Sequence, residues 1–115
     1  MIRIVAYRDA ASRWVGFSAS GHSGYAEEGS DIVCAAVSAL TITCVNSLEA
    51  LLGVQPQIEG GEDGRLKCLV TLPQNEQTVT GIQLLFGSLM LGLEQMAQDW
   101  PKYVKLSIQE RRETP

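Results

Sequence analysis

Histidine, cysteine and positive charge are scarce in this chain of 115 residues. It has one histidine and three cysteines, and 9 Lys and Arg residues against 13 Asp and Glu residues give a formal net charge of −4. Arg111 and Arg112 are the only adjacent basic residues, so the sequence contains no basic cluster of the kind that binds a phosphate backbone. We therefore expect no direct binding of nucleic acid.

The few cysteines bear on metal binding and on the cellular compartment. Cys34, Cys44 and Cys68 form no C-x-x-C pair, and their spacing from one another and from His22 matches no common zinc site. An odd number of cysteines in a chain without a secretory leader favours a reducing compartment. We predict a cytoplasmic protein with free thiols that needs neither a metal nor another cofactor.

Long hydrophobic runs are also missing. The start of the chain, Met1 to Val5, lacks the long apolar core of a signal peptide. Two windows without charged residues, 32–48 and 77–93, are interrupted by polar residues or glycine and fall short of a membrane span. Buried helices explain these windows better, so we expect no association with a membrane.

The residues that are present indicate one globular domain over 1–115, with 45% hydrophobic and 19% charged residues. Alternation predicts strands at 2–7, 14–20, 57–59, 66–72 and 104–108, and helical spacing predicts helices at 31–52 and 75–100. We predict an α/β fold, a two-layer sandwich of β-β-α-β-β-α-β order in which two long helices pack on one small sheet. The uncharged length of the second helix exceeds what a small sheet covers, which suggests a homodimer.

Core positions follow from the same periodicity. In the first helix the core-facing stripe should consist of Val33, Val37, Leu40, Cys44, Leu48 and Leu51. Cys44 in that stripe and Cys68 in a strand are predicted to be small apolar core residues. Gly81, Gly87 and Gly92 each weaken the second helix by up to about 1 kcal/mol relative to alanine, so we expect close packing against a neighbour to explain them.

The single histidine and one cysteine form a candidate catalytic pair. His22 lies twelve residues before Cys34, which falls in the first turn of the predicted helix. A thiol attacks as the thiolate, and both a helix N-terminus and a nearby imidazole favour that form. Continued strand alternation would place His22 on one face with Ser18 and Ser20. The N–H groups of the first helical turn are candidate donors to an oxyanion.

Gly21, Asp31 and Ser38 are predicted to support this pair. Asp31 can cap the helix or orient His22, because a carboxylate acting on Cys34 itself would raise the pKa of the thiol and oppose its activation. Ser38 lies one turn beyond Cys34 on the same face, where it either takes part in the site or only tolerates partial burial.

The segment 23–30 between the two candidates is predicted to be a substrate lid. Gly24 and Gly29 permit the backbone to bend, and the residues between them, including Tyr25, Glu27 and Glu28, have little to bury. A loop in this place could close over a bound peptide. The alternative is an ordinary surface connection.

Two strings in this region resemble a known family. GHSGYA at 21–26 and GSDIVCAAVS at 29–38 closely resemble the signature of the ribosomal-processing cysteine protease (Prp) family, and the similarity covers essentially the whole chain. In that family a histidine and a cysteine at these positions form the catalytic dyad, which implies that His22 is the proton donor and base and Cys34 the nucleophile. The resemblance also implies a dimer of small α/β subunits.

The same resemblance implies a substrate. The family acts on the N-terminal extension that some bacteria carry on the twenty-seventh protein of the large ribosomal subunit, and it cuts after a pair of phenylalanines.

Two other functions remain open from the residues alone. One is a thiol-dependent hydrolase or acyl transferase of another substrate, since dyad chemistry recurs on unrelated folds. The other is a non-catalytic, dimeric ribosome-assembly factor in which Cys34 is only a small helix residue.

Overall fold

A computed structural model describes residues 1–22, 24–27, 31–62 and 64–111. Ser23, Glu28, Gly29 and Ser30 of the predicted lid lie outside the described residues. The chain forms one sheet and two helices in the order β1 (Ile2–Arg8), β2 (Trp14–Ser20), α1 (Ile32–Leu52), β3 (Gln57–Glu62), β4 (Arg65–Leu69), α2 (Glu76–Asp99) and β5 (Val104–Glu110). The predicted α/β class and the predicted element order are both confirmed.

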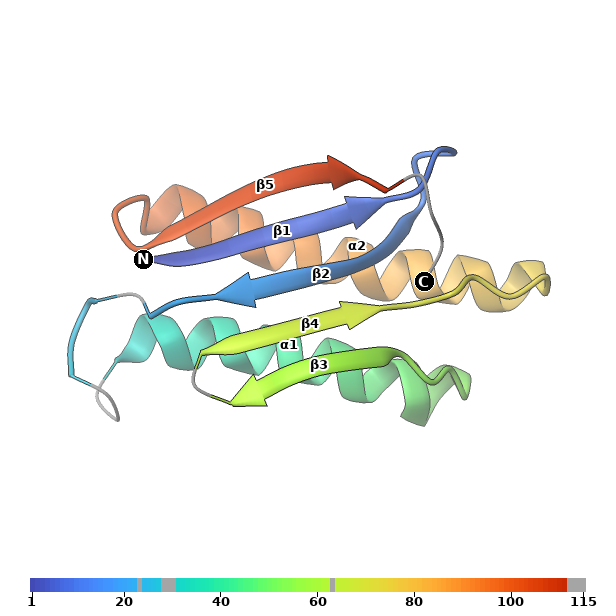
Figure 1. Cartoon of the computed structure of the whole chain (residues 1–115), viewed down its shortest axis with the longest axis horizontal. Helices are drawn as coiled ribbons and strands as arrows, with labels where there is room; N and C mark the ends of the chain where they lie inside the picture. Colours follow the sequence, from blue (N-terminus) through green and yellow to red (C-terminus); the bar gives the residue numbers. More distant parts are fainter. Residues whose placement is uncertain (23, 28–30, 63, 112–115) are drawn as a thin grey trace.

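The five strands lie in the order β3-β4-β2-β1-β5 (Figure 1). Neighbouring strands are antiparallel except for β1 and β5, which are parallel. The parallel pairing is possible because β5 follows α2, which returns the chain to the end of the sheet where β1 begins. The last strand of the chain thus lies beside the first.

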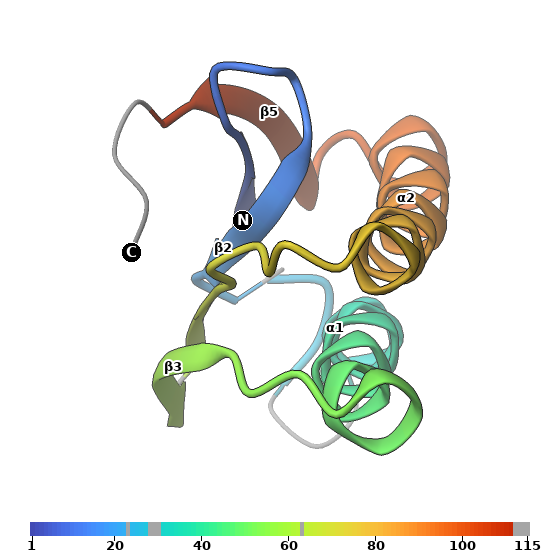
Figure 2. The same cartoon turned by 90° about the vertical axis from the view of Figure 1, so that its right-hand side faces the viewer.

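Both helices cover the same face of the sheet, and the other face carries no helix among the described residues (Figure 2). Alternation in β1 sets this arrangement, because Ile2, Ile4 and Ala6 are buried against the helices while Arg3 between them is exposed. Phe17 of β2 meets Phe86 of α2 edge to face, with ring centroids 6.4 Å apart. The core lies between these two layers, as the sequence predicted.

The buried stripe of α1 differs from the predicted one at its end. The buried residues are Val33, Val37, Thr41, Cys44 and Leu48. Leu51, which was expected in the core, is 70% exposed, and its neighbour Leu52 packs against the core instead. Thr41 is buried because its hydroxyl donates to the carbonyl of Val37 at 3.0 Å, which satisfies its polar atom inside the helix.

Two of the α2 glycines allow the helices to approach closely. A Cβ on Gly81 would lie 2.7 Å from a methyl carbon of Leu52, and a Cβ on Gly92 would lie 3.1 Å from a methyl carbon of Leu40. The predicted reason for these glycines is therefore correct at both positions. It is wrong for Gly87, where an added Cβ would meet nothing within 4 Å.

The β3–β4 hairpin has different bounds from those predicted. β3 runs on to Glu62 through the glycines that were assigned to the turn, because a register shift between Gly60 and Glu62 lets the strand continue with Gly60 at a φ of +81°. β4 ends at Leu69 rather than at residue 72, although Val70 still donates its N–H to the carbonyl of Val15.

α1 also has the length and apolar composition of a membrane-spanning helix. In this fold it packs along α2 and buries one stripe of side chains against the core. We therefore interpret α1 as a core helix that retains an apolar outer face.

Candidate active site

Gly21 turns the chain out of the sheet just before the histidine. Its φ of +91° is strained for any other residue, and an added Cβ would lie 2.4 Å from the carbonyl oxygen of Met1. Its N–H donates to the carbonyl of Gly64 at 2.9 Å. Because β2 ends at Ser20, His22 does not continue the strand face of Ser18 and Ser20, and that expectation is wrong.

Gly64, in the connection between β3 and β4, lies against the imidazole of His22. A Cβ on Gly64 would lie 3.0 Å from both Cε1 and Nε2 of the ring, and the φ of Gly64 is +68°. The absence of a side chain here lets the hairpin backbone support the ring of an otherwise exposed residue. The sequence predicted a turn at this glycine, but no local signal linked it to a histidine 42 positions earlier.

Cys34 occupies the first turn of α1, where Asp31 caps the helix. The carboxylate Oδ1 of Asp31 accepts the N–H of Cys34 at 2.9 Å, and its carbonyl accepts the N–H of Ala35 at 3.0 Å. The capping role predicted for Asp31 is therefore present, and this carboxylate is almost fully buried. These two N–H groups already have acceptors, so they are not free to meet an oxyanion as the sequence had suggested.

Two hollows meet at Cys34. The first, of about 450 Å³, is lined by His22, Gly24, Ala26, Asp31, Cys34, Ala35 and Ser38. The second, of about 180 Å³, is lined by Ile2, Ala19, Ser20, Gly21, Cys34, Val37, Ser38, Thr41, Ile42, Gly61, Gly64, Arg65 and Leu66. Cys34 and Ser38 belong to both. The fold thus brings the histidine, the cysteine and the three predicted supporting residues to one region of the surface.

The three thiols differ in their surroundings. Cys34 is partly exposed, whereas Cys44 and Cys68 are buried in the core as predicted. Burial raises the pKa of Cys44 to about 11. Burial, together with the charge of the neighbouring Cys44, raises the pKa of Cys68 to about 12. The two core thiols therefore stay protonated near neutral pH, and Cys34 is the thiol in a position to react.

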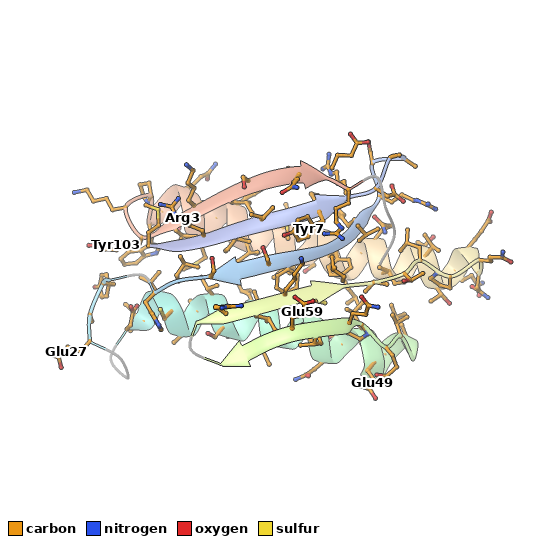
Figure 3. The ribbon with its side chains drawn as sticks, in the orientation of Figure 1. Arg3, Tyr7, Glu27, Glu49, Glu59 and Tyr103 are labelled. Carbon is orange, nitrogen blue, oxygen red and sulfur yellow. The ribbon has the colours of Figure 1, made fainter. Side chains whose placement is uncertain are left out.

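The described part of the predicted lid is held by aromatic contacts. The ring of Tyr25 meets Trp100 edge to face, with centroids 5.2 Å apart, and it meets Tyr103 in the same way at 5.4 Å. Gly24 and Glu27 are exposed, and Figure 3 shows Glu27 at the outer end of the loop, pointing away from the sheet. The sequence did not predict this contact because Trp100 is 75 positions from Tyr25.

Within the part of the chain that the structure describes, no group of three or more His, Cys, Asp and Glu side chains could hold a metal ion. What the region offers is a partly exposed thiol at a helix start and an imidazole along the same hollow. This combination is typical of cysteine hydrolases.

Comparison with known families identifies the particular class. A family model described as cysteine protease Prp matches residues 1–105, so the chain belongs to the Prp family of cysteine proteases. A curated relative, the ribosomal processing cysteine protease Prp of Bacillus subtilis (strain 168), is 30% identical over 93 residues. That match covers 79% of this chain and 82% of the relative.

Solved structures share this fold. The crystal structure of SMU.848 from Streptococcus mutans matches with a TM-score of 0.79 and 30% identity, and the match covers 96% of each chain. The ribosomal processing protease Prp of S. aureus, solved with a covalently linked product peptide, matches with a TM-score of 0.84 and 22% identity, over 95% of this chain and 100% of that one. At that identity the second structure supports the shared fold.

Proposed function

We propose that this cysteine protease uses Cys34 as its nucleophile and His22 as its acid and base, and that it removes an N-terminal extension from a ribosomal protein of the large subunit. The observation that carries the proposal is that Cys34 and His22 line one hollow while both other thiols are buried. The name of the B. subtilis relative supports ribosomal processing, and the family resemblance in the sequence implies the N-terminal extension.

The chemistry would take two steps. The thiolate of Cys34 attacks the peptide carbonyl, and His22 protonates the nitrogen of the leaving amine as the C–N bond breaks. A water molecule, losing its proton to His22, then attacks the thioester, which releases the carboxylate and the thiol. The capping of α1 by Asp31 supports this scheme, since it fixes the first turn and so the position of Cys34.

The second hollow is proposed to take an apolar side chain of the substrate beside the cleaved bond. Val37, Ile42 and Leu66 line this second hollow, and Cys34 lies at the junction of the two hollows. An apolar side chain held there would bring its own carbonyl group to the thiol. This arrangement suits the phenylalanine pair that the family resemblance implies.

The segment 23–30 is proposed to be the lid over this peptide. Gly24 has a φ of +74° and lines the histidine hollow, and Tyr25 anchors the segment to the corner between α2 and β5. The exposed Glu27, with Glu28, would attract basic residues of a ribosomal protein. Closure would exclude water while the peptide bond is cleaved, and opening would then admit the water that hydrolyses the thioester.

We propose in addition that the protein acts in the cytoplasm as a homodimer. Leu84 and Leu91 lie seven residues apart on one face of α2 and are each 70% exposed. A second copy would cover this apolar surface. Membership of a cysteine protease family disfavours the non-catalytic assembly factor, whereas a different peptide substrate remains an alternative.

The test is mass spectrometry of the ribosomal protein incubated with wild-type protein, with Cys34→Ala and with Cys34→Ser. The wild type should release one defined N-terminal peptide, and both variants should release none while keeping the wild-type circular dichroism spectrum. Cys44→Ala serves as the control, because it removes a thiol from the core and should lower stability while cleavage remains. Cleavage by Cys34→Ala would contradict the proposed nucleophile, and an intact substrate with a reactive Cys34 would point to a different peptide.

A further inference from the structure

The open face of the sheet, which is the face away from both helices, carries a row of exposed basic side chains. Arg3 of β1 pairs in register with Lys105 of β5 on one side and with Ser20 of β2 on the other, and Ser20 pairs with Arg65 of β4. All four residues are exposed. We call Lys105, Arg3, Ser20 and Arg65 the basic row; it crosses four adjacent strands.

Two further cations lie on the same face around Tyr7. The Nζ of Lys67 is 5.8 Å from the centroid of the Tyr7 ring, and the Cζ of Arg111 is 5.2 Å from it. Figure 3 views this face and shows Arg3, Tyr7 and Glu59 on it. The open face thus carries five of the nine basic residues of a chain whose net charge is −4.

Acidic residues balance this charge only in part. Glu59 of β3 lies opposite Lys67, and the backbone register places Glu62 opposite Arg65. Neither of these positions pairs with Arg3 or Lys105, which face each other across β1 and β5. Among the residues that the structure describes, the one ion pair joins Arg13 to Asp9 in the β1–β2 turn, away from the basic row.

Like charges directly opposite each other on neighbouring strands destabilise a sheet. An anion bound between Arg3 and Lys105 would remove that repulsion. Strands are about 4.8 Å apart, so the row has a width of roughly 14 Å, with Lys105 and Arg3 on adjacent strands and Arg65 two strands from Arg3. Such a spacing suits a chain of phosphates better than a single small anion, and the exposed hydroxyls of Ser20 and Ser107 can donate to phosphate oxygens.

We propose that this open face binds the phosphate backbone of RNA. The exposed part of the row offers charge and hydroxyl groups but no aromatic platform, since Tyr7 is 8% exposed and donates or accepts a hydrogen bond with Ser18 at 3.1 Å. The binding is therefore independent of base sequence and lacks base stacking. It goes beyond the proposed proteolysis, because Arg3 and Lys105 line neither hollow at Cys34, although Ser20 and Arg65 at the other end of the row also line the second hollow. The sequence-based expectation of no nucleic-acid binding rested on the net charge of −4 and on the lack of a basic cluster along the chain.

The first measurement is fluorescence anisotropy of a labelled single-stranded RNA of 20 nucleotides, titrated with the protein over a range of KCl concentrations. We expect dissociation constants in the micromolar range at low salt, as is common for non-specific binding. A plot of log K against log salt should have a slope of about −2 to −3.5, because three to five phosphate contacts each contribute about −0.7 on a single strand. No binding at 25 mM KCl would overturn the proposal.

Charge-reversal variants test whether RNA binding depends on the basic row or only on the net charge of the protein. Arg3→Glu and Lys105→Glu should each weaken binding at low salt by about tenfold, since each removes a phosphate contact and adds a repulsive charge. Lys102→Glu is the matched control. It changes the net charge equally, but it lies in the exposed turn before β5. We expect less than about a twofold effect from it.

Other outcomes would also overturn the proposal. Equal losses in Lys102→Glu and Arg3→Glu would mean that net charge and not the row governs binding. Binding of polyglutamate or of phosphatidylglycerol vesicles at least as tight as that of RNA would assign the face to an acidic protein or a lipid surface instead. Circular dichroism melts of all variants establish that the fold is kept, and none of these readouts depends on protease activity.

Discussion

Cys34 differs from the other two thiols in exposure, and this difference predicts selective alkylation. With iodoacetamide near neutral pH, the native protein should take up one carbamidomethyl group, on Cys34. Cys44 and Cys68 should react only after unfolding, because burial raises their pKa values to about 11 and 12 and keeps them protonated and covered. Peptide mass spectrometry with and without urea locates each modification. Early labelling of Cys68 would contradict its place in the core.

The partnership of His22 with Cys34 can be tested by the same reaction. His22→Ala should slow alkylation of Cys34 near neutral pH, because an imidazole within reach can take the proton of the thiol. Cleavage of the ribosomal protein should be lost. Identical pH profiles in both proteins would mean that His22 does not act on Cys34.

Gly64 is the residue whose role emerges only from the fold. Gly64→Ala places a methyl group 3.0 Å from two ring atoms of His22 at a φ of +68°, so either the ring or the hairpin must shift. We expect cleavage to fall by about tenfold or more, since small displacements of a catalytic group are costly. Gly53→Ala, at the end of α1, is the matched control, because its φ is +67° but an added Cβ there meets nothing within 4 Å. Equal losses in both variants would indicate that backbone strain, and not contact with His22, lowers cleavage.

At the scale of elements, the side chain of Tyr25 connects the loop between β2 and α1 to the turn between α2 and β5. Tyr25→Ala removes two edge-to-face contacts, each worth about 0.5–1.5 kcal/mol beyond burial. We expect faster amide hydrogen exchange over 23–30 and a higher KM for the substrate peptide, with α1 and α2 exchanging as before. Tyr25→Phe keeps the rings and is the control.

The same variants test the lid. Adding a non-cleavable substrate peptide to the wild type should slow exchange in 23–30, and Tyr25→Ala should show a smaller protection. Unchanged exchange on peptide binding would mean that the segment is a static surface connection.

At the scale of the whole molecule, the outer helix surface should hold two copies together. Leu84→Glu with Leu91→Glu would place two charges on the exposed apolar face of α2. Sedimentation velocity should then give a monomer for this variant and a dimer for the wild type. Glu94→Lys is a suitable control, because it changes charge on an exposed position of the same helix. A wild-type protein that sediments as a monomer at micromolar concentration would contradict the homodimer.

The sequence by itself determined the order of the elements and the core-facing residues of most of them. In Ile2–Arg8 the apolar residues alternate, and from Val33 to Leu48 they recur at helical spacing. Because each of these elements buries one face, the spacing of its apolar residues identifies the residues that face the core. The capping role of Asp31 was also predictable, because its carboxylate accepts the N–H of a residue only three positions away in the sequence. The end of α1 was not, because the choice between Leu51 and Leu52 depends on the approach of Gly81 from another helix.

The tertiary structure alone decided what surrounds the site and what gathers on the open face. Gly64 reaches His22, and Trp100 reaches Tyr25, only because hairpin, loop and helix end meet in space. The basic row is likewise invisible along the chain, where Arg3, Arg65 and Lys105 stand far apart. Strand register places them side by side. Because burial of the side chains on the helix-covered face fixes that register, the packing of the core aligns these charged residues on the opposite face.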